Sequence, residues 1–331
     1  MNITTEKQRP SLTRASAVWI ARTVPWLLLI SAMWMVVTNA RNPQYLWMVF
    51  APWAEVGCLA IIMTPIIITG GIDLSVGSIV AVSGMTLGVL WHHAEWPIWM
   101  SAVATIVVGT LAGSLNGWLV VIGMSPLVAT LATMAFFRGL SMAISNAQQV
   151  DRFPESFVDM AQIGGIPIQF WLLLVTIVLC FIIVHFSRFG RWCFAIGDNR
   201  IASRFAAVPV RRVDWLLYSA SGLVCALVAI SNAMKQDVVL PDAQSGVELS
   251  AIACIVVGGT LITGGRGGIL QTVLGLAVVS TLDVGLNFLS SRVNWLTGES
   301  RLIVVGLLLI VVAVLNEKGM RDKSRSALTR S

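Results

Sequence analysis

The sequence predicts an all-α polytopic membrane protein of about ten transmembrane helices, some of them broken or short. Of its 331 residues, 56% are hydrophobic and only 11% are charged, whereas about 25% of the residues of a soluble protein are charged. Apolar runs of about 20 residues recur along the chain, and each is long enough to cross a hydrocarbon core of about 30 Å. The chain therefore divides into a basic tail at 1–17, a transmembrane domain at 18–315 and a second basic tail at 316–331.

The predicted spans follow one another with short polar turns between them. Their approximate boundaries are 18–38, 46–69, 79–91, 98–122, 127–147, 168–186, 213–233, 249–263, 269–289 and 302–315. Pro52 and Pro65 are expected to break the second span, because proline removes a helical hydrogen bond, and the eighth is short for a full crossing. Gly109, Gly113 and Gly117 lie four residues apart in the fourth span, which favours close packing against another helix.

A basic loop at 188–212 sets the predicted orientation. It is the only long charged stretch inside the apolar sequence, and its single acid, Asp198, is outnumbered by the arginines 188, 191, 200, 204, 211 and 212. Cytoplasmic loops carry an excess of Lys and Arg, so this loop and both basic tails are expected in the cytoplasm. An even number of spans agrees with that placement. Membrane orientation also explains the net charge of +6 better than nucleic-acid binding does.

Inside the basic loop the sequence predicts one short helix of about two to three turns. Asp198 or Asn199 can cap its start by accepting backbone N–H bonds. Pro209 is expected to stop it, because the residue before a proline disfavours the helical region.

This short helix has an apolar face and a basic face. Ile201, Phe205 and Val208 follow the i, i+4, i+7 spacing of one face, and Arg200 and Arg204 share another. Two interpretations are equally supported by these residues. The helix docks into the groove of a partner protein, or it lies on the membrane surface with its arginines near anionic lipid.

One short motif occurs twice. Ile-Ile-Ile-Thr-Gly-Gly at 66–71 and Thr-Leu-Ile-Thr-Gly-Gly at 260–265 each end an apolar run. Repeats with broken helices at matching places are common in transporters. Helix ends closed by glycine explain so short a match more simply.

The sequence contains none of the usual catalytic or metal-binding motifs. It has no HExxH and no GxSxG, and its five cysteines form no CxxC pair, so they are expected to be small buried hydrophobes. The glycines of 264–268 are not followed by the Lys-Ser/Thr of a phosphate-binding loop. We therefore expect no catalytic residue, no metal site and no cofactor bound by this chain; if ATP drives it, a separate subunit hydrolyses the ATP.

Polar residues inside the predicted spans are candidates for a translocation path, because each is costly in lipid unless it is paired or hydrated. The candidates are Glu55, Asp73, Ser75, Asn116, Arg138, Asp283 and Asn287. As a group they suggest a path that hydrogen-bonds a hydroxylated solute. Taken singly, each favours a structural role: Glu55 could pair with Arg138. Asp73 could cap a helix that starts at Leu74, and Asn116 could bridge two helices.

Several motifs together resemble the membrane permeases of ribose-type sugar ABC importers, within the branched-chain and sugar permease superfamily. The motifs are Thr-Gly-Gly-Ile-Asp-Leu-Ser-Val-Gly-Ser at 69–78, Phe-Arg-Gly at 137–139 after Thr-Leu at 130–131, Ala-Ile-Gly-Asp-Asn at 195–199 followed by alanines at 202, 206 and 207, Gly-Val-Glu-Leu-Ser-Ala-Ile-Ala at 246–253, and the glycine-rich 258–268. The resemblance covers almost the whole chain, and the motifs occur in the family's order.

The resemblance implies a permease subunit that moves a monosaccharide into the cytoplasm by ATP-driven alternating access. Its implied partners are a cytosolic ABC ATPase that uses ATP and Mg, a periplasmic sugar-binding protein and a second permease subunit, identical or sister. The implied location is the bacterial inner membrane, with multiple passes and both termini cytoplasmic. It favours docking for the short helix, whose coupling residues would be Gly197, Asp198, Asn199, Arg200, Ile201, Ala202, Arg204, Phe205 and Val208.

The sequence departs from the family pattern at a few positions. Asp198 stands where a glycine is common, and Ala207-Val208 stand where Gly-Ile is common. Ser250 occupies a position where aspartate is frequent, so a carboxylate role there is absent or belongs to Glu248.

The alternative function is a proton-coupled secondary transporter of a small polar solute, with Glu55 or Asp283 as the proton relay. It predicts uptake that needs a proton gradient and no ATPase. A membrane-embedded enzyme ranks last, because the sequence offers no catalytic cluster.

Overall fold

The computed structural model describes residues 34, 43–290 and 306, and most of this part of the chain is helical. Six of its helices are long and apolar enough to cross a membrane. They are α2 (Pro43–Ile68), α4 (Ile98–Val121), α5 (Pro126–Ile144), α7 (Ile168–Phe186), α10 (Val210–Gln236) and α12 (Ile269–Ser290). Two shorter apolar helices are α3 (Val76–His92) and α11 (Val247–Val257). The all-α polytopic prediction is confirmed; apart from residues 34 and 306, the predicted spans at 18–38 and 302–315 lie outside the described residues.

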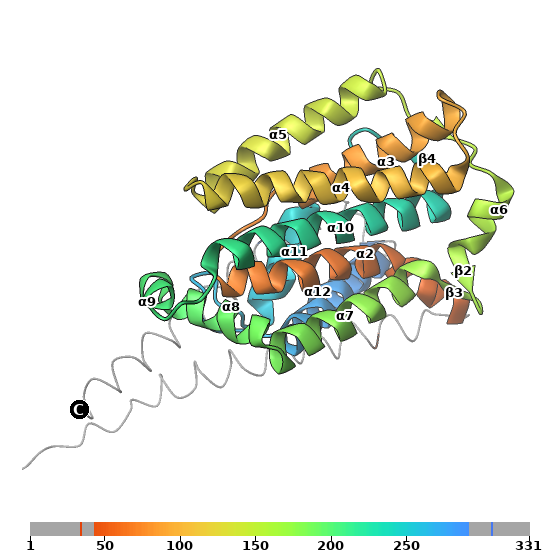
Figure 1. Cartoon of the computed structure of the whole chain (residues 1–331). Coiled ribbons are helices and arrows are strands. Elements are labelled where there is room, and N and C mark those ends of the chain that lie inside the picture. The colour runs from red at the N-terminus through yellow and green to blue at the C-terminus, as the bar shows by residue number, and fades with distance from the viewer. Residues whose placement is uncertain (1–33, 35–42, 291–305, 307–331) are drawn as a thin grey trace, which may run out of the picture. The chain divides into compact units, whose positions relative to one another are not determined.

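α4 and α10 pack against each other along much of their length (Figure 1). A Cβ atom built on Gly109 would lie 2.7 Å from Cβ of Ala226, and one on Gly113 would overlap the carbonyl oxygen of Tyr218. Real side chains do not approach backbone so closely, so only glycine allows this spacing. The close packing predicted from the glycine spacing is confirmed.

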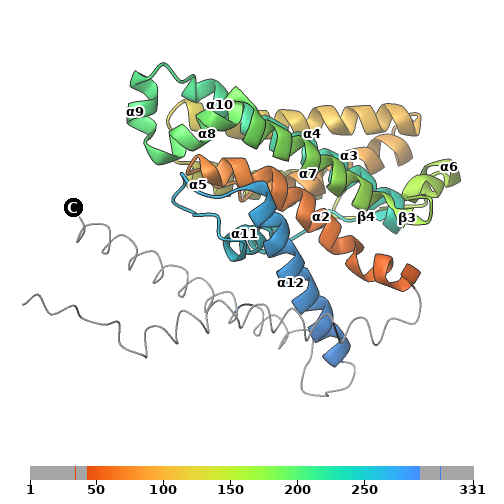
Figure 2. The ribbon, with the colours of Figure 1, turned by 90° about the horizontal axis from the view of Figure 1, so that it is seen from below.

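Several other helices pack beside this pair. α3 contacts α4, α5 and α10, while α2 contacts α7, α10 and α11, and Figure 2 shows these helices seen from below. The core lies among α2, α3 and α10, where Leu59, Met63, Ile79 and Cys225 are fully buried. The outer faces of α4, α5 and α7 expose large apolar side chains, as expected of surfaces that face lipid.

α2 is continuous through both of its prolines, so the predicted break in the second span is wrong. Each proline removes one backbone hydrogen bond from the helix. The half of α2 from Leu59 to Ile68 is almost completely buried, and packing against α7, α10 and α11 offsets that loss.

The first Thr-Gly-Gly motif closes α2 as predicted. Gly70 has a φ of +78°, and the amide of Gly71 donates to the carbonyl of Ile66 at 2.9 Å. A left-handed glycine directly after the last helical turn is a common helix termination.

The second Thr-Gly-Gly motif does not end a helix. α11 ends at Val257, not near residue 263, because Gly259 takes a φ of +97° and already closes it. Residues 263–265 form a separate turn that lies against the first motif, and the Gly265 amide donates to the Ile68 carbonyl at 2.9 Å. The two copies of the motif are thus in direct contact.

The polar connections lie at two opposite ends of the helices (Figure 1). At one end β1 (Val150–Asp151) pairs antiparallel with β4 (Val238–Val239), near the β2 (Gln162–Ile163)–β3 (Ile166–Pro167) hairpin, α6 (Glu155–Val158) and the 3₁₀ helix η1 (Asp159–Ala161). At the other end lie α8 (Arg188–Asp198) and α9 (Arg200–Phe205). The predicted span at 168–186 separates residues 148–167 from the basic loop, and the structure places these two polar connections at opposite ends of the helices.

Candidate functional site

The basic loop folds into two short helices rather than one. α8 begins after Ser187, whose hydroxyl accepts the amide of Gly190 at 3.2 Å. α9 begins after Asn199, whose side-chain oxygen accepts the amides of Ile201 at 3.0 Å and Ala202 at 2.9 Å. Asn199 is therefore the cap of the predicted helix, and Asp198 is the last residue of α8.

α9 presents an apolar tip to the surroundings. The side chains of Ile201 and Phe205 are 68% and 89% exposed. The helix ends at Phe205, before Pro209, so it is shorter than predicted. Val208 lies beyond that end and packs half-buried against the core, so its predicted place on the apolar face of the short helix is wrong.

The two arginines of α9 have different surroundings. Arg200 forms an ion pair with Asp214 of α10, whereas Arg204 is exposed. The two arginines lie four residues apart on α9, as predicted, but the carboxylate of Asp214 holds only Arg200 in an ion pair against α10. Cys193 of α8 is buried as expected, and burial raises the pKa of its thiol to about 12, so it packs as a neutral side chain.

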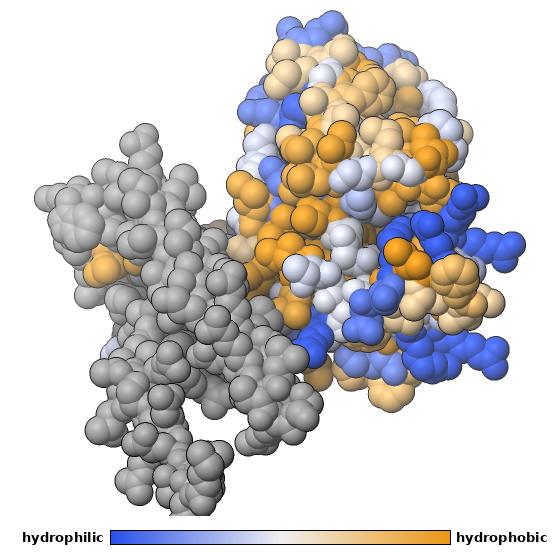
Figure 3. All heavy atoms as spheres, turned by 90° about the vertical axis from the view of Figure 1, so that its left-hand side faces the viewer, coloured by the Kyte–Doolittle hydropathy of each residue, from blue (hydrophilic) through white to orange (hydrophobic). Residues whose placement is uncertain are grey.

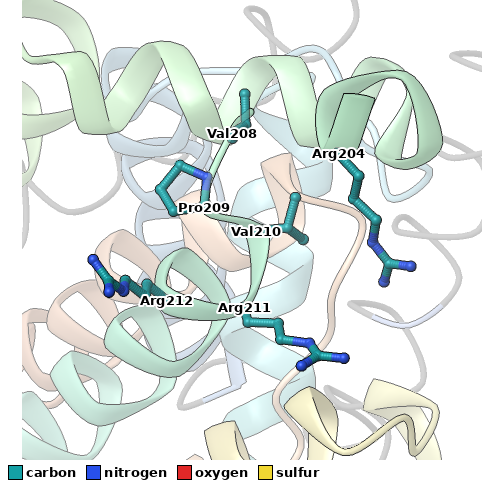
Figure 4. A pocket seen from close by; sticks show the side chains of 6 residues that line it. All are labelled: Arg204, Val208, Pro209, Val210, Arg211 and Arg212. Carbon is teal, nitrogen blue, oxygen red and sulfur yellow. The ribbon is translucent and has the colours of Figure 1, made fainter. Parts of the chain in front are cut away.

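A groove of about 360 Å³ lies where α9 connects to α10. It is lined by Arg204, Val208, Pro209, Val210, Arg211 and Arg212. Figure 4 shows Arg204 and Arg211 extending to the same side of this groove and Arg212 to the other. Figure 3 looks onto this end of the helices, where hydrophilic side chains surround hydrophobic ones. This end of the helices therefore combines the positive charge of the groove arginines with the apolar tip of α9.

α8 rests on both Thr-Gly-Gly turns. A Cβ atom on Gly197 would overlap the carbonyl oxygen of Ile68 and lie 2.5 Å from the amide nitrogen of Gly265. This contact, here called the Gly197 joint, connects the basic loop to the end of α2 and to the 258–268 loop by backbone alone.

A first polar cluster lies between the helices and consists of Glu55, Gln169, Asn232 and Gln244 (the Glu55 cluster). The Glu55 carboxylate is buried; one oxygen accepts from Asn232 Nδ2 at 2.8 Å and from Gln244 Nε2 at 2.7 Å. The other oxygen lies 3.5 Å from Gln169 Nε2, which also donates to the Ser231 carbonyl at 3.1 Å. Side chains of α2, α7 and α10 and of the segment before α11 therefore meet at one carboxylate.

A second cluster consists of Asp73, Ser75, Asn116 and Ser221 (the Asp73 cluster), and all four are fully buried. One Asp73 oxygen accepts the amide and hydroxyl of Ser75 at 3.1 and 2.7 Å, and the other accepts the Ser221 hydroxyl at 2.9 Å. Asn116 Nδ2 donates to Ser75 Oγ at 2.6 Å, so Asn116 bridges α4 to this segment as predicted. The helix starts at Val76, not at Leu74, and Asp73 holds the residue directly before it.

Arg138 does not pair with Glu55, so that prediction is wrong. Its guanidinium donates to the carbonyl of Ala243 at 2.7 Å, and the nearby Ser141 hydroxyl donates to the carbonyl of Pro241 at 2.9 Å. α5 thus holds the 240–246 segment, whose Gln244 reaches Glu55.

The last two candidates lie on α12, where Asp283 is half-buried and Asn287 is exposed. Sequence reasoning missed Gln169, Asn232, Gln244 and Ser221. The available signal was their polarity beside apolar runs, since an amide in a membrane must also find hydrogen-bond partners.

Buried polar clusters among membrane-crossing helices, with a charged helical loop at one end, are features of a membrane permease. The comparison with protein families agrees. The chain belongs to the family described as branched-chain amino acid transport system / permease component, whose profile matches residues 49–313. The matched region contains both clusters and the basic loop.

Several individual relatives are named as import permeases. The chain is 33% identical over 267 residues to the ribose import permease protein RbsC of Bacillus subtilis, covering 79% of this chain and 81% of the relative. It is 29% identical over 303 residues to the autoinducer 2 import system permease protein LsrD of Photorhabdus luminescens, covering 88% and 89%. The ribose import permease of Escherichia coli K12 is 30% identical over 267 residues, covering 78% and 81%. No solved structure matches the chain.

Proposed function

We propose that this chain is the permease subunit of an ATP-driven importer for a monosaccharide or a similar hydroxylated solute. Membership of the permease family and the likeness to ribose and autoinducer 2 import permeases support this proposal. The subunit belongs in the bacterial inner membrane with both termini in the cytoplasm, and it acts together with a second, identical or sister, permease.

The observation that carries the proposal is the apolar tip of α9. Phe205 is 89% exposed in a strongly basic loop, and a large apolar side chain held out on a capped helix is suited to insertion into a protein groove. The groove belongs to a cytosolic ATPase that uses ATP and Mg, while this chain binds no cofactor itself. A periplasmic binding protein delivers the solute to the opposite end, near β1 and α6.

The mechanism is alternating access. ATP binding closes the two ATPase subunits, and their grooves displace α9 and, through α8, the Gly197 joint. The helices then open outward and accept solute, and hydrolysis resets them. Solute contacts within the bundle are weak, because the solute must also leave.

The test replaces the tip of α9. Phe205→Asp places a charge at the centre of the docking surface, and we expect at least a tenfold loss of ATPase binding, as at other interface hot spots. The measurement is the amount of a Walker-motif ATPase that copurifies with the tagged chain in mild detergent, together with solute uptake by cells. Met160→Asp makes the same type of change at the opposite end, in η1, and should retain the ATPase.

Normal uptake by Phe205→Asp at normal expression would refute the docking role. Recovery of the wild-type chain without any ATPase in several mild detergents, with uptake that collapses with the proton gradient, would favour the secondary transporter.

A further inference from the structure

We propose that the Glu55 cluster is the solute-binding site of this permease, built for the hydroxyl groups of a small neutral polyol or sugar, and that Gln244 occupies the place of a solute hydroxyl in the present conformation. This proposal rests on the proposed import function and says where in the molecule the solute binds.

The chemistry of the cluster fits adjacent hydroxyl groups. A carboxylate only accepts hydrogen bonds, while each amide side chain can both donate and accept. A sugar hydroxyl can therefore donate to Glu55 and accept from Asn232 or Gln169 at the same time. The carboxylate disfavours anionic solutes, and the nearby ammonium of Lys235 acts on it electrostatically, so the ligand expected here is neutral.

One buried atom of the cluster has an unused hydrogen-bonding capacity. Gln169 is fully buried, and its Oε1 has no hydrogen-bond partner within the described part of the chain. An unsatisfied buried polar atom destabilises the structure that contains it. A solute hydroxyl bound beside Glu55 would donate to this oxygen.

The 240–246 segment controls access to the carboxylate. It supplies Gln244, whose amide lies 2.7 Å from Glu55, and it is held by hydrogen bonds from α5 to two of its backbone carbonyls. A cavity of about 10 Å³ lies beside Asn232, between the small residues Ala81 and Gly84 of α3 and Ala243 of the segment. Binding pockets for small molecules are about 300 Å³ or more, so a sugar enters only when the segment withdraws. That movement also frees the Glu55 oxygen that Gln244 occupies.

The Asp73 cluster differs from the Glu55 cluster in that no movable segment contributes to it. Asn116 Oδ1 is also without a partner among the described residues, but every member of that cluster is fully buried and its fourth member, Ser221, lies within α10. None of its side chains belongs to the 240–246 segment. We therefore assign it to fixing the start of α3.

The test measures sugar binding by the purified full-length chain in detergent. The wild type is titrated with D-ribose, D-xylose, L-rhamnose and D-glucose, and thermal unfolding is followed with betaine as an osmolyte control. A ligand that binds only the folded state raises the unfolding temperature in a saturable way, and at least one of these sugars should do so. The site is overturned if none exceeds betaine.

Two variants shift the titration in opposite directions. Gln169→Leu removes the unpaired oxygen together with the N–H group that donates to the Ser231 carbonyl, so half-saturation should need at least about tenfold more sugar, as when a buried hydrogen-bonding group is lost. Gln244→Ala removes the competing amide, so half-saturation should need several-fold less sugar. Gln148→Leu, at an exposed position of the 148–167 loop, should titrate like the wild type.

If Gln169→Leu and Gln244→Ala both titrate like the wild type, the proposal is overturned. Weaker sugar binding by Gln244→Ala than by the wild type would also overturn it. ATP-dependent uptake in cells separates this inference from the importer assignment. If the assignment fails, uptake needs no ATPase although sugar binding persists. If the site fails, ATP-dependent uptake persists and Gln169→Leu leaves its half-saturation unchanged.

Discussion

Two buried carboxylates and one half-buried guanidinium in the described part of the chain are hydrogen-bonded mainly by neutral groups. Three amides surround Glu55, hydroxyls and one amide N–H surround Asp73, and backbone carbonyls receive Arg138. In each of these arrangements neutral groups, and not an oppositely charged side chain, make the hydrogen bonds to the charge. A carboxylate surrounded by neutral donors can exchange one donor for another, which suits a site that must release its ligand.

Asp214 is the exception among the described residues, because an ion pair with Arg200 satisfies it. Its side chain is only 4% exposed, while that of Arg200 is 37% exposed. Removing Arg200 leaves a buried carboxylate without its partner, and solvent around the arginine reduces the cost. We expect Arg200→Ala to lower the free energy of unfolding by about 1–3 kcal/mol.

Thermal unfolding in detergent measures this effect, and Arg191→Ala is the control. Arg191 is exposed on the neighbouring helix α8, so its removal should change stability little. In Arg200→Ala/Asp214→Asn the buried charge is gone, and much of the lost stability should return. A single Arg200→Ala variant as stable as the wild type would show that the ion pair does not stabilise the fold.

At the scale of elements, most helices could be predicted from apolar runs and turn residues. α4, α5, α7 and α10 lie within a few residues of their predicted spans. The errors occurred where tertiary contacts decide: burial carries α2 through Pro65, and α11 ends at Gly259 within an apolar stretch. α8 was not predicted, because its basic residues were interpreted as a loop. The segment is helical because Ser187 caps its first turn and the core buries part of it.

The contact between α4 and α10 provides a test at this scale. Gly113→Val would place a side chain into the carbonyl group of Tyr218 and force the helices apart. Overpacking of this kind costs about 1–3 kcal/mol, occasionally more. Gly139→Val is a matched control, because a Cβ there meets nothing within 4 Å.

The measurement is the unfolding temperature of the two variants side by side. Gly113→Val should unfold at a clearly lower temperature than the wild type. Gly139→Val should be unchanged or slightly stabilised, because valine is a better helix former than glycine. Equal behaviour of the two variants would contradict the role of the glycine spacing in helix packing.

At the scale of the whole molecule, the partners of each polar residue could not be predicted from the sequence. Glu55 and Gln244 are separated by most of the chain, and nothing in their local sequence specifies that Gln244 rather than Arg138 reaches the carboxylate. The contact between the two Thr-Gly-Gly motifs is equally invisible in the sequence, although their similarity is visible. Local patterns determine which segments are helices, while long-range packing determines which polar groups meet.

The Gly197 joint is where local and long-range structure combine. α8 connects the exposed tip of α9 to the backbone at the ends of both Thr-Gly-Gly turns. A displacement of α9 would therefore reach α2 and the 258–268 loop together. Because this contact joins backbone to backbone, a movement of α8 would reach the two turns directly and would not be absorbed by flexible side chains.

On the proposed docking of an ATPase at α9, we expect Gly197→Val to separate ATPase binding from solute transport. The added side chain would overlap the Ile68 carbonyl and push α8 away from the turns, while α9 and Phe205 remain available for docking. The ATPase should still copurify with the variant, and solute uptake should fall at least about tenfold, as expected when the contact that aligns a moving part is lost. Ala195→Val, at an exposed position of the same helix, should transport like the wild type. Loss of ATPase binding by Gly197→Val would instead show that the joint only holds the basic loop in shape, and normal uptake would show that movement reaches the helices by another route.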